Sequence, residues 1–176
     1  MSNGTRVASV ILMTHAEVRR QDALLAGIAG ATTLTAVHQA ARMVFDSAPR
    51  MDVVGMRAIA RAREAAAGTA NESTAPEGRH PAIYNMAFAG DMVVNSAYYS
   101  MATTWKRGAA LGLLAGVGAL VLPKKVGLGD PPNSELLSNQ LMTVAWYVVG
   151  GLAAACTAQC LAHRRLDPAQ ELMVGY

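Results

Sequence analysis

Asp91 is the one formal charge in an otherwise apolar stretch, residues 82–104, and its neighbours have side chains that suit binding or proton chemistry. On an ideal helix, Asp91 and four other residues lie within about 80° of one another. These four are Tyr84, Phe88, Asn95 and Tyr98. An ionised carboxylate inside a bilayer is costly, so such a residue is usually paired, neutral or functional. We therefore expect this face to point into the molecule.

His38 is the predicted partner of Asp91, because the two lie at similar depths in their apolar stretches. The candidate cluster is completed by residues of similar height or on the same face: Thr35, Asn95, Tyr98 and Arg42. A nearby carboxylate favours charged imidazole and burial opposes it, so the pair could share one proton. Three readings stay open: a structural pair that fixes helix register, a proton or ligand site, or no contact between the two.

Arg42 and Asp46 lie one helical turn apart, which predicts an i,i+4 ion pair at the membrane interface. The alternative is a polar mouth in which Arg42 binds an anionic headgroup or a substrate carboxylate. Cys156, Cys160 and His163 share a helix face and form a weak metal candidate. No fourth ligand is visible in the sequence, so we expect no metal and no cofactor.

Apolar helices must position these residues. The stretch 141–162 holds no charged side chain and has about the length that a bilayer requires, roughly 20 residues. The sequence predicts an all-α, four-span transmembrane bundle as a single membrane domain over 1–176, with spans at about 23–45, 82–104, 108–125 and 140–162. A polar segment, residues 46–81, is expected to contain an amphipathic helix between the first two spans. Pro81 should open the second span, and Trp105–Gly108 should form the turn into the third.

Composition supports a membrane protein and argues against other classes. Hydrophobic residues make up 52% of the chain and charged residues 15%, where about a quarter is usual in soluble domains. The net charge of +3 is small and the basic residues are scattered, so no nucleic-acid partner is expected. Motifs for nucleotide binding, metalloproteases, serine hydrolases and dithiol redox chemistry are missing from the sequence. Membrane lipid is the expected surrounding, in the plasma (inner) membrane. The cations divide almost equally between the two sides, and their closeness to the spans favours cytoplasmic termini.

Small residues provide the means for these helices to pack. Gly108, Gly112 and Gly116 recur at every fourth position, which predicts close helix–helix contact. The partner helix could belong to the same chain or to a second copy in a homo-oligomer or a larger membrane complex. The sequence favours a structural or accessory membrane component. The alternatives are a small transport or proton-linked sensing module that uses His38 and Asp91, and an intramembrane enzyme on a lipid-like substrate. The enzyme is the weakest of these, because no nucleophile or metal set stands out.

Overall fold

The computed structural model describes the backbone of residues 3–68 and 81–174, and the side chains of residues 19–68 and 81–164. Over these ranges the chain is all-α, with five helices and no strand. The helices are α1 (Asn3–Val44), α2 (Met51–Ala66), α3 (Pro81–Tyr99), α4 (Trp105–Lys125) and α5 (Leu137–Val174).

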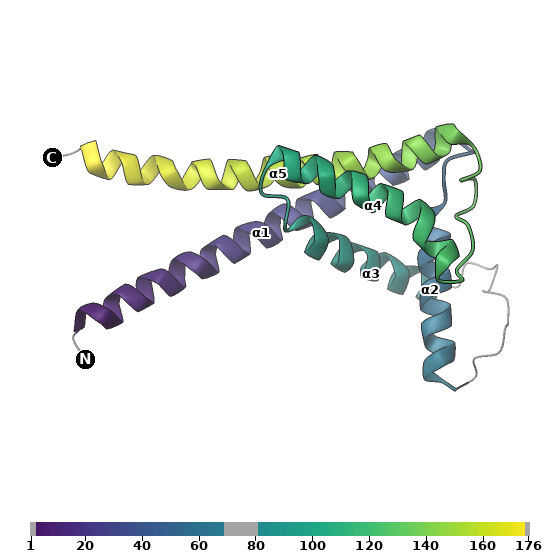
Figure 1. Cartoon of the computed structure of the whole chain (residues 1–176), viewed down its shortest axis with the longest axis horizontal. Helices are drawn as coiled ribbons and strands as arrows, with labels where there is room; N and C mark the ends of the chain where they lie inside the picture. The colour runs from purple at the N-terminus through teal and green to yellow at the C-terminus, as the bar shows by residue number, and fades with distance from the viewer. Residues whose placement is uncertain (1–2, 69–80, 175–176) are drawn as a thin grey trace.

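Four of the helices form a bundle, and α2 closes one end of it. Helix α5 packs against both α1 and α4, and α3 packs against α1. Helices α3 and α4 follow each other in sequence but hardly touch. Figure 1 shows α2 lying across the bundle at the end opposite both termini, while α1 and α5 separate from each other towards the termini.

The ends of the central helices follow from local sequence signals. Pro81 begins α3, where its missing N–H and fixed φ suit a first helical position. The side chain of Thr104 caps α4 by accepting a hydrogen bond from the backbone N–H of Arg107. Trp105–Gly108 is therefore the first turn of α4 and not the predicted interhelical turn, which instead follows Tyr99. A good cap just before Trp105 favours helix over turn at that point.

The glycine row packs against α5 of the same chain. Gly108, Gly112 and Gly116 are all buried. A Cβ atom at Gly112 would lie 2.5 Å from the backbone oxygen of Tyr147, and one at Gly116 would lie 2.7 Å from the Cα of Val144. Only glycine allows the backbones of α4 and α5 to come this close. Of the two sequence-based alternatives for this row, the structure shows packing within one chain.

Two helices are long and apolar enough to cross a membrane: Trp105–Lys125 in α4 and Leu137–Arg164 within α5. Only 17% and 33% of the residues in the most apolar part of these two helices are buried inside the structure, so most of these residues face outward. Among the described residues α1 and α3 do not reach the same hydropathy, because threonine, histidine and glutamine dilute α1 and polar residues interrupt α3. The two apolar helices are consistent with membrane association.

Polar contacts fix α2 and the loop between α4 and α5 to each other. Arg57 donates to the backbone oxygens of Leu128 and Asp130, both at 3.0 Å, and Arg61 donates to that of Val126 at 2.9 Å. The predicted amphipathic helix thus exists, but it covers only Met51–Ala66 of the segment 46–81. Residues 69–80 of that segment lie outside the described residues.

Candidate functional site

A cavity of about 240 Å³ lies between the helices at the α2 end of the bundle. All five helices contribute side chains to its wall, and most of these are apolar. Helix α2 covers the cavity, and Trp146 and Tyr147 line it from α5. Three members of the sequence-predicted cluster line it as well: Thr35, His38 and Asp91.

Asp91 lines the cavity from α3 and has a single hydrogen-bond partner in the described structure. Its Oδ1 accepts a hydrogen bond of 2.8 Å from the amide nitrogen of Asn95, one turn along the same helix. Asn95 is buried and holds the carboxyl group in place. No lysine or arginine lines the cavity, and no ion pair to Asp91 is formed by the described side chains. Asp91 is therefore a carboxyl group in a mostly apolar wall without a cation beside it.

His38 does not bind Asp91, its predicted partner, but a backbone carbonyl before α2. Its Nε2 lies 3.0 Å from the carbonyl oxygen of Pro49. A carbonyl only accepts, so Nε2 is the donor. The imidazole ring also packs on Trp146, with ring centroids 5.0 Å apart and planes tilted by 32°. No hydrogen bond or ion pair joins His38 to Asp91, although both line the cavity.

The reason lies in the path of the chain. The segment before α2 turns back beside α1 and brings the carbonyl of Pro49 to the imidazole. Asp91 meanwhile finds its nearest donor on its own helix. Depth along a helix axis places two residues at one level but gives no information about such competing partners.

The remaining members of the predicted cluster point in different directions. The Thr35 hydroxyl contacts the sulfur of Met92 at 3.4 Å. The Tyr98 hydroxyl donates to the backbone oxygen of Leu111 at 3.0 Å and thereby ties α3 to α4. Tyr98 is thus a contact between helices and does not line the cavity.

Arg42 pairs with Asp52 of α2 and not with the predicted Asp46. The distance from its Nη1 to Oδ2 of Asp52 is 3.2 Å, and Nη2 of Arg50 lies equally close to the same oxygen. The reversal before α2 brings Asp52 back over the end of α1, so a carboxylate on another helix replaces the one a turn away. Because Arg42 is bound to Asp52, its guanidinium is not free to bind an anion, which was the alternative role predicted from the sequence.

Asp52 is the more enclosed partner of both ion pairs, with a side chain only 9% exposed. Burial alone would raise the pKa of Asp52, but the hydrogen bond from Arg50 and the charge of Arg42 outweigh it and hold that pKa below its ordinary value. Oδ1 of Asp52 and Nε of Arg50 are buried without a hydrogen-bond partner. The cluster joins α1 to α2 and forms part of the cavity roof.

Aromatic side chains make up much of the cavity wall. Tyr84 and Phe88 of α3 stack with centroids 6.4 Å apart and planes at 25°. Trp146 and Tyr147 of α5 line the same cavity. The sequence placed Tyr84 and Phe88 beside Asp91 but gave no role to Trp146. A tryptophan in the middle of an apolar stretch, away from the interfaces that tryptophan usually prefers, was the signal that could have identified it.

The weak metal candidate is not assembled as a site. Cys156 and Cys160 are free and exposed on α5. Within the part of the chain that the structure describes, no three histidine, cysteine or acidic side chains come together as metal ligands.

Comparison with known proteins gives no counterpart for this arrangement: no protein-family model matches the chain, and neither does any curated protein or solved structure.

Proposed function

We propose that this chain is an integral membrane protein with four spans, formed by α1, α3, α4 and α5. The support comes from where the large apolar side chains lie. Leu24 of α1 and Val93 of α3 are 54% and 68% exposed, much like Leu114 of α4 at 66%. Soluble proteins rarely expose contiguous apolar surface on this scale, whereas lipid covers it at no cost.

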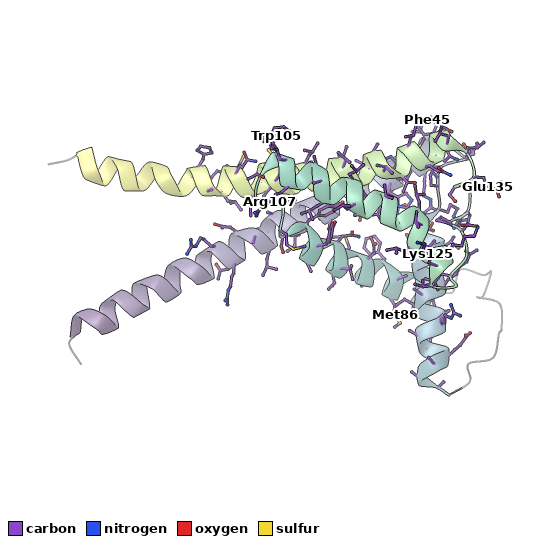
Figure 2. All side chains as sticks on the ribbon, in the orientation of Figure 1. Phe45, Met86, Trp105, Arg107, Lys125 and Glu135 are labelled. Atoms are coloured by element: carbon purple, nitrogen blue, oxygen red, sulfur yellow. The ribbon has the colours of Figure 1, made fainter. Side chains whose placement is uncertain are left out.

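Charge at the two ends of the bundle agrees with a membrane between them. Trp105 and Arg107 lie at the end of α4 nearer the termini, and Lys125 and Glu135 lie at the opposite end (Figure 2). Helix α2, which carries three arginines, lies across the bundle there (Figure 1). An amphipathic helix in that position suits the headgroup region.

Within this membrane protein, we propose that the cavity is the working part and binds a small, largely apolar molecule, either to sense it or to move it. The single observation that supports this is a partly open cavity of about 240 Å³ in which one of the two lining carboxyl groups, Asp91, stands in an apolar and aromatic wall without a cation beside it. Binding sites for small molecules usually combine such walls with a few polar groups. A structural or accessory role is the second candidate, favoured by the extension of α1 and α5 beyond the bundle (Figure 1).

Two experiments test the proposal. The chain should stay with membranes during alkaline carbonate extraction, and recovery of folded protein without detergent would refute the four spans. For the cavity, 2-phenylethanol should raise the melting temperature in detergent, because a ligand that binds only the folded state stabilises it. Ala119→Phe, at a residue that lines the cavity, should abolish this effect.

Val117→Phe is the matched control, since Val117 lies two residues away on α4 and is 47% exposed. It should respond to 2-phenylethanol as the wild type does. Equal responses from both variants would mean that the alcohol acts on the micelle and that the cavity is not a ligand site.

A further inference from the structure

We propose that the ligand of this cavity is a compact organic cation, an amine with an apolar body, and that Asp91 is its counter-ion. This inference rests on the proposed function of the cavity as a ligand site and specifies the chemical class of the ligand. Three properties of the site support it: size, charge and the nature of its walls.

The size of the cavity limits the ligand to a small molecule. A dry protein cavity of 150 Å³ is known to hold benzene, which has six heavy atoms. By simple proportion, the 240 Å³ found here would hold roughly ten heavy atoms. An aromatic amine with a short alkyl chain has about this number of heavy atoms.

The charge around the cavity calls for a cation. Asp91 receives one hydrogen bond, from Asn95, so Oδ2 has no hydrogen bond from the described side chains. The nearest arginines, Arg42 and Arg50, are bound to Asp52 at the roof. A carboxylate in an apolar surrounding is costly without a cation, and a bound ammonium group would supply one together with N–H donors.

The walls suit the rest of such a molecule. Tyr84 and Phe88 on α3 and Trp146 on α5 provide aromatic rings on two sides of the space. Aromatic faces attract ammonium groups, and they also pack against an apolar body. A carboxylate and several rings around one small cavity are the features that recognise an amine, whereas an anionic ligand would meet two carboxylates, Asp91 and the arginine-bound Asp52.

The experiment uses the full chain in detergent with Trp105→Phe as background. Trp105 is 60% exposed and lies outside the cavity, and the chain has two tryptophans, so the remaining fluorescence reports on Trp146. The probes are 2-phenylethylamine, which is protonated at pH 7, and 2-phenylethanol, a neutral molecule of the same size. We expect saturable fluorescence changes with both and at least tenfold tighter binding of the amine.

Asp91→Asn should remove most of this tenfold preference and leave binding of the alcohol unchanged. Addition of phosphatidylethanolamine, whose headgroup carries an ammonium group, distinguishes the source of the cation. Displacement of the probe would assign the site to the lipid headgroup, and no displacement would assign it to a free amine.

The outcomes separate this inference from the proposed function. If the alcohol binds as tightly as the amine in the chain with Asp91 intact, the proposal that the ligand is a cation is refuted. The cavity would then remain a ligand site. An unchanged preference in Asp91→Asn would also refute Asp91 as the counter-ion. If neither probe changes the fluorescence of Trp146, the ligand site itself is wrong, and the inference fails with it.

Discussion

Gly112 lies in the close contact between α4 and α5, and alanine there should separate the two helices. The added Cβ would lie 2.5 Å from both the backbone oxygen of Tyr147 and the Cα of Val148. Backbone atoms cannot move aside by changing rotamer, so α4 and α5 must move apart. Overpacking of this kind costs about 1–3 kcal/mol. Replacing a helical glycine gains back about 0.5–1 kcal/mol. We expect a net loss of up to about 2.5 kcal/mol for Gly112→Ala.

Gly118→Ala on the same helix is the matched control. Its Cβ would meet only the Cδ1 atom of Leu122, at 3.4 Å, which is an ordinary contact. This variant should therefore gain about 0.5–1 kcal/mol from helix propensity alone. Unfolding in detergent, followed by helical circular dichroism, should place the two variants on opposite sides of the wild type. Gly112→Leu should lose more than Gly112→Ala, and Leu113→Ala should lose little, because Leu113 is 52% exposed. Equal stability of the two alanine variants would refute close packing of α4 on α5 at Gly112.

Three further changes test the α2 end of the bundle by unfolding in detergent. Asp52→Asn should cost about 1.5–3 kcal/mol at neutral pH, the range for hydrogen bonds to a charged group. Because the pKa of Asp52 is lowered in the folded state, the difference in unfolding free energy between Asp52→Asn and wild type should shrink as the pH falls below about 4 and the carboxylate is protonated. A difference that grows as the pH falls would contradict this. Gly127→Ala should destabilise the protein, because Gly127 has a φ of 78° and an added Cβ would lie 2.8 Å from the guanidinium of Arg61. An unchanged melting temperature would count against that contact. His38→Phe should cost about 1 kcal/mol through the lost bond to Pro49, and His38→Ala should cost more because the ring contact is lost too; equal losses would mean that the ring packing does not contribute.

Much of the helical framework could be predicted because its signals are local. The predicted stretches 108–125 and 140–162 lie within α4 and α5, and 23–45 lies in α1 apart from its last residue, whereas 82–104 runs past the end of α3 at Tyr99. Pro81 begins α3 as expected. The glycine row could also be predicted as a packing face, because a spacing of four residues places its members on one side of a helix. Its partner in the structure is α5 of the same chain. The number of membrane spans depends on overall hydropathy, and by that measure only α4 and α5 qualify among the described residues.

The contacts of the polar residues could not be predicted in the same way. Arg42 was expected to bind Asp46, and His38 was expected near Asp91, but both bind groups at the start of α2 or just before it. Those groups reach α1 only because the chain reverses before α2. The loop between α4 and α5 contacts that reversal through the hydrogen bond from the backbone N–H of Arg50 to the carbonyl of Pro132. Helical periodicity contains no information about such a contact, which joins residues far apart in sequence.

The cavity itself follows from the distribution of small and large side chains. Glycine brings α4 against α5 through Gly112 and α1 against α3 through Gly27, whose Cβ would meet the backbone of Ser96. Helices α3 and α4 each pack on another helix in this way and hardly touch each other. Large rings such as Tyr84 and Trp146 line the resulting gap but do not fill it. The small residues that hold the helices together thus leave room between them for the cavity that Asp91 lines.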